Sequence, residues 1–339
     1  MSQLKNKEIV LDSYPEGKIG LEHFRLEERE LPPLKDGEYL VENQWLSLDP
    51  YVRPRLNAEA PSYVEAIKLG EMVQGETVGV VLESRNPRFK AGDQVFAVSG
   101  WARYWIGTDQ MFITSVLPET DLEPSVFLGV AGTPGRAAYF GLDRIGKPKA
   151  GETLVISAAS GAVGSVAGQL GKQAGCRVVG LAGSDEKCRY VVEELGFDAC
   201  INYKTDDLGQ ALRESCPQGI DIYFENVGGR VSAFVARFLN EGARVPVCGV
   251  AANYDKRDCI DVSSQSSFFA SLPEPPESRF FFVTDWFKDY PQATMVLLDA
   301  AQKGAIKFRE TIAEGLESTP QAFIDMLHGK HFGKQLVRL

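Results

Sequence analysis

The stretch at residues 152–183, ETLVISAASGAVGSVAGQLGKQAGCRVVGLAG, decides the fold of this chain. Residues 153–157 form a short apolar run rich in β-branched side chains, which predicts a buried strand. Small residues follow, then a helical stretch from about 163 to 173, and after Gly175 a second apolar strand at 177–181. A strand, a tight turn, a helix and another strand form a βαβ unit of the length seen in nucleotide-binding halves.

The turn of small residues at 158–164 is the functional signal within this unit. Small side chains let the backbone approach a pyrophosphate, and the start of the following helix offers unpaired N–H groups and a partial positive charge. The alternative is a glycine-rich turn that only packs a helix closely against a sheet. The strand–turn–helix context favours a dinucleotide site over that alternative.

Size and charge limit what the chain can do. Its 339 residues, 44% of them hydrophobic, suffice for two domains. A net charge of −10 argues against a nucleic-acid partner and against binding to an anionic membrane. The sequence has no long apolar run and no signal-peptide segment at its start, so we expect a soluble, cytoplasmic protein.

The few potential metal ligands and nucleophiles are scattered along the sequence. The six cysteines lie apart with no C-x-x-C pair, and there are three histidines, of which only His23 precedes residue 176. A zinc site needs three or four clustered ligands, so we expect no metal centre. A serine-hydrolase elbow, G-x-S-x-G, is also absent from the sequence.

The rest of the chain divides by its texture into two parts. Residues up to about 125 suggest a β-rich domain, with strands at 38–45, 74–84 and 93–98. From residue 130 helices and strands alternate, with strands at 199–203, 220–224, 243–250 and 280–283, which predicts a doubly wound, mostly parallel sheet. The tail, with a helix at 319–327, is expected to rejoin the first domain.

The end of the second strand of the βαβ unit indicates the cofactor. A site for the unphosphorylated dinucleotide normally has a carboxylate there, but this chain has Leu181, Ala182 and Gly183, followed by Ser184 and Lys187. A hydroxyl and a lysine suit a ribose phosphate, and on a helix Lys187 can face the site while Asp185 and Glu186 face solvent. NADP(H) is therefore expected over NAD(H), with a solvated helix lysine as the alternative.

At this point the sequence resembles a known family. Its motifs are LSLDPYVRPRL from Leu46, GDQVFAVSGWARY from Gly92, GTPGRAAYFGL from Gly132, SAASGAVGSVAGQLGK from Ser157, GSDEKCRY from Gly183, LGFDACINYK from Leu195, IDIYFENVGG from Ile220, VCGVAANY from Val247 and GKHFGKQLV from Gly329. They resemble the zinc-free medium-chain dehydrogenase/reductases of the leukotriene B4 12-hydroxydehydrogenase, prostaglandin reductase and alkenal double-bond reductase group. The resemblance covers nearly the whole chain but does not specify a substrate.

The resemblance implies a fold, a reaction and a set of cofactor contacts. The fold is an α/β one, with a Rossmann domain at 129–306 and a β-rich, GroES-like domain at 1–128 and 307–339. The reaction is NADPH-dependent reduction of the C=C bond of α,β-unsaturated aldehydes or ketones. The implied cofactor-binding residues are Gly161, Ala162, Val163 and Gly164 at the pyrophosphate, Lys187 and Tyr203 at the adenosine end, and Asn226, Cys248, Gly249, Tyr254, Phe281, Phe282 and Val283 towards the nicotinamide. His331 stands where the family usually has asparagine, so that contact departs from the pattern, although imidazole can also donate a hydrogen bond.

Tyr254 is the candidate catalytic residue, since hydride addition to an enone builds negative charge on the carbonyl oxygen and a donor is needed there. Tyr51 and Trp101 are expected to line the substrate pocket. Cys248 is expected to be a neutral residue packed against the cofactor rather than a nucleophile, because hydride transfer requires none. The proton donor to the α-carbon stays open between Tyr254 and water.

Other functions remain possible from the sequence alone. An NADP-dependent secondary alcohol dehydrogenase of the 12-hydroxy-eicosanoid type and a quinone reductase are the enzyme alternatives. A non-catalytic, crystallin-like NADPH-binding protein is the alternative from another class. Family relatives are usually homodimers, and the apolar segment 280–283, expected at a sheet edge, could mediate such a contact.

Overall fold

A computed structural model describes residues 4–60, 64–108, 113–254 and 262–339. These residues form two compact units. Unit 1 contains the described residues up to 128 together with 310–339, and unit 2 contains 129–254 and 262–309. The domain boundaries expected from the sequence, at 128/129 and 306/307, concern independent folding and stay predictions.

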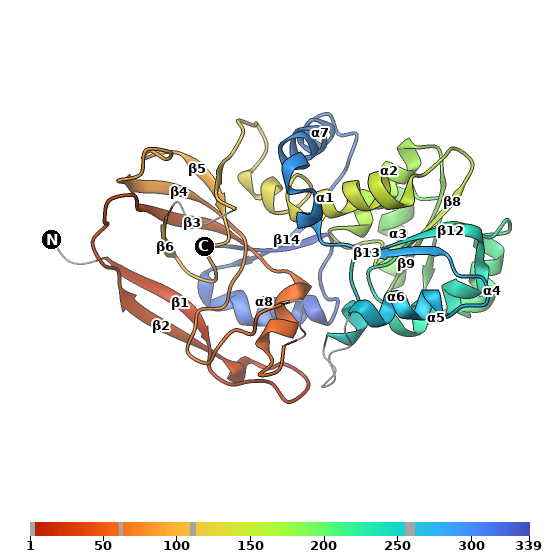
Figure 1. Cartoon of the computed structure of the whole chain (residues 1–339), viewed down its shortest axis with the longest axis horizontal. Helices are drawn as coiled ribbons and strands as arrows, with labels where there is room; N and C mark the ends of the chain where they lie inside the picture. Colours follow the sequence, from red (N-terminus) through yellow and green to blue (C-terminus); the bar gives the residue numbers. More distant parts are fainter. Residues whose placement is uncertain (1–3, 61–63, 109–112, 255–261) are drawn as a thin grey trace. The chain divides into compact units, whose positions relative to one another are not determined.

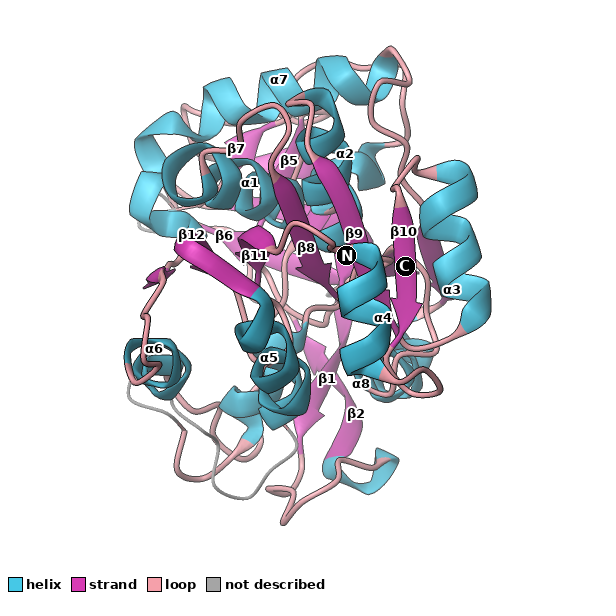
Figure 2. Cartoon of the chain, turned by 90° about the vertical axis from the view of Figure 1, so that its right-hand side faces the viewer, coloured by secondary structure: helices cyan, strands magenta, loops and turns pink. Residues whose placement is uncertain are grey.

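Unit 2 is built on a six-stranded sheet in the order β10-β9-β8-β11-β12-β13, in which every neighbouring pair is parallel (Figures 1 and 2). The chain fills the sheet outward from β8 in one direction and then returns to continue from β11 in the other. The direction therefore changes between β8 and β11, and ligands of open parallel sheets bind outside the carboxyl ends of the strands at such a point. The strands are β8 (Thr153–Ser157), β9 (Arg177–Ala182), β10 (Ala199–Asn202), β11 (Ile220–Phe224), β12 (Leu239–Val247) and β13 (Glu277–Phe280).

Helices cover both faces of this sheet. Helices α1, α2 and α7 lie on one face, and α4, α5 and α6 lie on the other (Figures 1 and 2). With both faces covered, the central strands are apolar along their whole length, as the fully buried β8 illustrates. The helices are α1 (Thr133–Phe140), α2 (Gly164–Gln173), α3 (Asp185–Arg189), α4 (Leu208–Ser215), α5 (Gly229–Val235), α6 (Val262–Ala270) and α7 (Tyr290–Gln302), with π-helical turns η4 (Gly141–Gly146) after α1 and η5 (Tyr190–Glu194) after α3.

Two strands of this sheet, β12 and β13, differ from the sequence-based prediction by more than one residue. β12 begins at Leu239, four residues before the expected start, and ends at Val247 rather than at 250. β13 spans Glu277–Phe280, whereas the apolar pattern placed a strand at 280–283. Pairing explains the shift, because residues Arg244 to Val247 of β12 align with Glu277 to Phe280, and the chain then turns into the 3₁₀ segment η8 (Val283–Asp289). β13 does lie at the sheet edge, and its role in a homodimer stays a prediction.

Unit 1 contains a seven-stranded mixed sheet in the order β14-β15-β3-β4-β5-β7, with β6 paired to β3. A separate antiparallel pair joins β1 to β2. Helix α8 (Thr319–Leu327) contributes Phe323 to the core, and Trp101 packs against it with the ring centroids 5.4 Å apart. The strands are β1 (Lys5–Leu11), β2 (Phe24–Glu30), β3 (Tyr39–Ser47), β4 (Thr77–Ser84), β5 (Gln94–Ala97), β6 (Tyr104–Gly107), β7 (Ser115–Val116), β14 (Glu310–Glu314) and β15 (Lys334–Arg338).

A buried ion pair ties the tail of the chain to the early part of unit 1. Lys334 at the start of β15 donates from Nζ to Asp49 Oδ1 and to the carbonyl oxygen of Leu48, both at 2.6 Å. Lys334 is 4% exposed and Asp49 is 8% exposed, and Ser47 Oγ also donates to Asp49. Asp49 directly precedes the 3₁₀ segment η2 (Pro50–Leu56), so the pair holds the loop that carries Tyr51.

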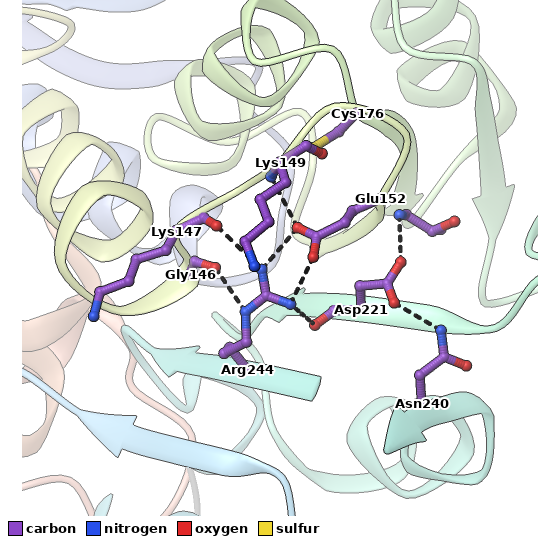
Figure 3. A network of polar contacts seen from close by, with 9 residues as sticks. Gly146, Lys147, Lys149, Glu152, Cys176, Asp221, Asn240 and Arg244 are labelled. Carbon is purple, nitrogen blue, oxygen red and sulfur yellow. Dashed lines mark hydrogen bonds and ion pairs between the residues drawn. The ribbon is translucent and has the colours of Figure 1, made fainter. Parts of the chain in front are cut away.

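A polar network closes the amino-terminal edge of the sheet in unit 2 (Figure 3). The Arg244 guanidinium binds both carboxylate oxygens of Glu152, at 3.0 and 2.7 Å. On the same edge Asp221 accepts hydrogen bonds from the backbone N–H of Thr153 and from Asn240 Nδ2, each at 2.8 Å. The charges at this edge are therefore paired or hydrogen-bonded and lie at the opposite ends of the strands from the switch-point edge.

The expected fold class is confirmed as a doubly wound parallel sheet with a second, β-rich part. None of the helices in the described part of the chain has both the length and the apolar character needed to cross a bilayer.

Candidate functional site

The carboxyl ends of β8, β9, β11 and β12 bring together most of the residues that the sequence singled out. They belong to unit 2, and each follows directly on the strand that positions it.

The turn after β8 lies close against the start of the following helix, α2. Ala158 adopts a left-handed conformation with φ of 50°, and its carbonyl oxygen accepts a hydrogen bond from the N–H of Gly161 at 2.9 Å. A Cβ atom on Gly164 would overlap the carbonyl of Ala158, so only glycine fits at the start of α2. A Cβ atom on Gly161 would meet only the Ala158 oxygen, at 3.2 Å, with open space otherwise. A side chain at position 161 would fill the space above this turn, and a bound pyrophosphate needs that space.

The end of β9 carries a cationic cluster. Ser184 caps α3 by accepting a hydrogen bond from the backbone N–H of Lys187 at 3.3 Å. On this short helix Asp185 and Glu186 are exposed and Lys187 is half-buried, as the sequence predicted. The pKa of Lys187 is lowered, first by burial and then by the neighbouring charge of Lys204. Because the charges of the two lysines repel each other, an anion bound beside them would stabilise both charges.

Tyr203 and Lys204, which follow β10, complete this cluster. A Cβ atom on Gly183 would lie 3.0 Å from the Tyr203 hydroxyl and 3.2 Å from Lys204 Cε. Burial raises the pKa of Tyr203, so its hydroxyl keeps its proton and can donate a hydrogen bond. The sequence had pointed to Lys187 and Tyr203 but not to Lys204, although a basic residue directly after the third strand is the signal that could have revealed it.

Asn226, at the end of β11, is held firmly against the end of β8. Its backbone N–H donates to Ser157 Oγ at 2.8 Å, and its side-chain Nδ2 donates to the Ser157 carbonyl at 2.7 Å. The preceding residue, Glu225, is fully buried and accepts hydrogen bonds from several donors around the site. Glu225 was missed in the sequence, where the signal was a lone acidic residue directly after a wholly apolar strand.

The end of β12 places Cys248, Gly249 and Tyr254 next to Asn226. The backbone N–H groups of Cys248 and Gly249 donate to the Glu225 carbonyl, at 2.8 and 3.2 Å. Burial, followed by the charge of Glu225, raises the pKa of the Cys248 thiol to about 12, so it stays a neutral thiol at physiological pH. A Cβ atom on Gly249 would lie 3.4 Å from both the Tyr254 hydroxyl and the Asn226 carbonyl oxygen, which places the phenol beside this turn.

Of the residues that follow β13, Phe281 has a buried side chain and Phe282 an exposed one. Phe281 is 3% exposed and packs against Trp286, with ring centroids 5.6 Å apart. Phe282 is 40% exposed, and Val283 begins η8. A nicotinamide contact from Phe281 would therefore come from its backbone rather than from its ring.

The three remaining candidates belong to unit 1. Tyr51 is 36% exposed at the start of η2, and His331 is half-buried in the loop before β15. Trp101 is fully buried and stacks on Phe24, with centroids 5.4 Å apart, inside the core. A core side chain offers a ligand no surface, so the predicted pocket role of Trp101 gains no support from its position.

Within the described residues no group of three or more histidine, cysteine, aspartate or glutamate side chains is arranged to hold a metal ion.

Two family models match the chain: the N-terminal domain of oxidoreductase over residues 7–115 and zinc-binding dehydrogenase over residues 162–272. The NADPH-dependent curcumin reductase of Escherichia coli (strain K12) is 41% identical over 338 residues, covering 99% of this chain and 97% of that protein. The 2-alkenal reductase (NADP(+)-dependent) of Nicotiana tabacum is 36% identical and covers 99% of this chain and 98% of its own length. The crystal structure of CurA in complex with NADPH from Vibrio vulnificus is similar to this chain with a TM-score of 0.89 at 40% identity, covering 98% of each chain.

Proposed function

Because the chain belongs to the zinc-free, curcumin-reductase-like family of medium-chain dehydrogenase/reductases, it is an oxidoreductase, and we propose that it reduces the C=C bond of α,β-unsaturated aldehydes and ketones with NADPH. The observation that carries this proposal is the pair Lys187 and Lys204 beside Gly183. Two lysines at the end of the second strand suit a ribose phosphate, where an NAD site would offer a carboxylate.

The residues at the switch point fit the phosphorylated dinucleotide along its length. The open space above Gly161 and the N–H groups at the start of α2 would receive the pyrophosphate. Asn226, Cys248 and Gly249 would bind towards the nicotinamide, where their hydrogen bonds to β8 and β11 hold them in place. When bound, NADPH supplies the hydride for the β-carbon of the substrate.

Tyr254 would donate its phenolic proton in a hydrogen bond to the substrate carbonyl oxygen, where negative charge develops. A preorganised donor at such an oxygen lowers the barrier by about 3 kcal/mol. Cys248, as a neutral thiol, would pack beside the cofactor and take no covalent part. Tyr51, partly exposed in unit 1, is the remaining candidate for substrate contact, and His331 is proposed as a cofactor contact.

The experiment that tests this function is a substrate panel assayed by NADPH oxidation at 340 nm, a wavelength set by the cofactor's own absorbance. The panel contains an enone, the saturated ketone with the same carbon skeleton and a quinone, each also assayed with NADH. We expect turnover of the enone with NADPH, with the saturated ketone as product. Turnover of the saturated ketone alone would indicate an alcohol dehydrogenase, and turnover of the quinone alone would indicate a quinone reductase. A protein that binds NADPH and turns over none of the three would be a binding protein.

A further inference from the structure

Glu225 is a fully buried carboxylate at the switch point, directly after β11. It has no exposed surface, and no ion pair to it occurs among the described residues. A buried charge costs several kcal/mol unless its surroundings compensate for it, so its retention calls for a reason.

Within the described part of the chain, this charge is held by hydrogen bonds. Oε1 accepts from the hydroxyls of Ser157 and Tyr223, both at 3.0 Å, and from the backbone N–H groups of Val227 at 2.7 Å and Gly228 at 2.9 Å. Oε2 accepts from Ser232 Oγ and from Gln265 Nε2, the latter at 3.3 Å. Backbone N–H groups can only donate, so this set of partners fits an ionised carboxylate. Burial and Glu225 raise the pKa of Tyr223 well above its ordinary value, so the phenol remains a donor.

The charge lies within the turn that would hold the nicotinamide end of the cofactor. The carbonyl oxygen of Glu225 accepts from the backbone N–H groups of Cys248 and Gly249, and Asn226 is the next residue in the chain. The field of Glu225 reaches this turn, because it contributes to the raised pKa of the Cys248 thiol. The carboxylate therefore acts electrostatically on the residues proposed to flank the nicotinamide.

We propose that Glu225 is a positioning residue whose fixed negative charge stabilises the oxidised, cationic nicotinamide over the reduced, neutral one. The inference rests on the proposed function, because it requires that the dinucleotide bind at this turn. Loss of hydride turns a neutral ring into a cation, so a nearby buried carboxylate favours that change and makes bound NADPH a stronger hydride donor. The alternative is that Glu225 only anchors the turn through its hydrogen bonds.

The test compares the dissociation constants of NADP+ and NADPH, measured separately by isothermal titration calorimetry, in the wild type and in Glu225→Gln. Glutamine keeps an acceptor oxygen and nearly the same volume but removes the charge. We expect the ratio of the NADP+ constant to the NADPH constant to rise on the order of tenfold. A purely anchoring role would change both constants equally, and an unchanged ratio in the folded variant would overturn the proposal.

Asp221→Asn is the matched control, because Asp221 is the second residue of β11 and lies towards the opposite end of this strand from Glu225 (Figure 3). The same loss of charge there should leave the ratio unchanged. Gln265→Lys is a second route that keeps Glu225 and places a cation beside it, and it should raise the ratio in the same direction even where Glu225→Gln does not fold. A wild-type protein that binds neither form of the dinucleotide would instead contradict the proposed function.

Discussion

At the scale of single residues, the proposed chemistry of the site depends on the phenol of Tyr254, which lies beside Gly249. A Cβ atom on Gly249 would lie 3.4 Å from the Tyr254 hydroxyl, so the phenol borders the same backbone turn that holds Cys248. The Cys248 thiol is too weak an acid to compete as a nucleophile, which leaves Tyr254 as the proposed donor at this turn. Its removal should affect the chemical step rather than cofactor binding.

Tyr254→Phe is expected to lower kcat with an enone by about 100-fold, the effect of losing one donor at a developing oxyanion. The dissociation constant for NADPH should change little, because the ring stays in place. Steady-state kinetics with saturating enone and a fluorescence titration with NADPH measure the two quantities. Unchanged kcat would remove Tyr254 from the mechanism.

Lys187→Ala should weaken NADPH binding by about 10- to 100-fold, the effect of losing one charge-assisted hydrogen bond. NADH binding should stay nearly the same, because NADH lacks the phosphate. Lys303→Ala is the control, since Lys303 is an exposed lysine directly after α7 that pairs with Asp299. Equal losses for both cofactors in the Lys187 variant would show that this residue does not recognise the phosphate.

The lowered pKa of Lys187 also predicts a pH dependence. A bound phosphate favours the charged ammonium, so the affinity for NADPH is complete below the pKa of Lys187 and is lost as the pH rises through it. Because this pKa is below that of an ordinary lysine, the loss should begin at a lower pH than for an unperturbed side chain. Titrations with NADPH and NADH between about pH 7 and 10 test this, and NADH should show no such loss.

At the scale of elements, the turn between β8 and α2 involves two glycines, Gly161 and Gly164, for which we expect different roles. Gly164→Ala would press Cβ against the Ala158 carbonyl, so the variant should lose about 1–3 kcal/mol of stability. In Gly161→Ala the new Cβ atom would meet only the Ala158 oxygen, at 3.2 Å, so the melting temperature should fall less than that of Gly164→Ala while NADPH binding weakens. Thermal melts and NADPH titrations of both variants separate the two effects. Normal NADPH binding by Gly161→Ala would show that the pyrophosphate does not bind above Gly161.

Elements that are bounded by glycine or fully buried could be predicted from the sequence. β11 and α8 occur where the pattern placed them. The last strand of the parallel sheet was misplaced because its pattern is half-exposed, and its position depends on the register with β12 rather than on apolar residues of its own. Pairing across a sheet is not encoded locally, and a local pattern cannot reveal it.

The candidate site follows the same division. Turn residues such as Gly164 have a local signature, whereas Glu225 and Lys204 gain their importance from groups on other strands. The partners of Glu225 include Ser157, which lies 68 residues away in the sequence. Such a network becomes visible only when the parallel sheet brings the strand ends together.

At the scale of the whole molecule, the tail is tied to unit 1 by the buried pair Lys334–Asp49. Lys334→Met should lower the free energy of unfolding by about 3–5 kcal/mol, because Asp49 would remain buried without its cation. The double variant Asp49→Leu/Lys334→Met should recover part of this loss. Urea unfolding followed by circular dichroism measures both, and a double variant less stable than the single one would show that the pair does more than neutralise a charge.

The strand that Lys334 begins has a further consequence for how the protein is made. β15 inserts between β14 and β3, and β3 is formed from residues 39–47 near the start of the chain. While the polypeptide emerges from a ribosome, part of β3 therefore lacks its neighbour until residues 334–338 have been synthesised. The nucleotide-binding unit can complete its own sheet during that interval, whereas the nascent first unit exposes a strand edge that invites association with other chains.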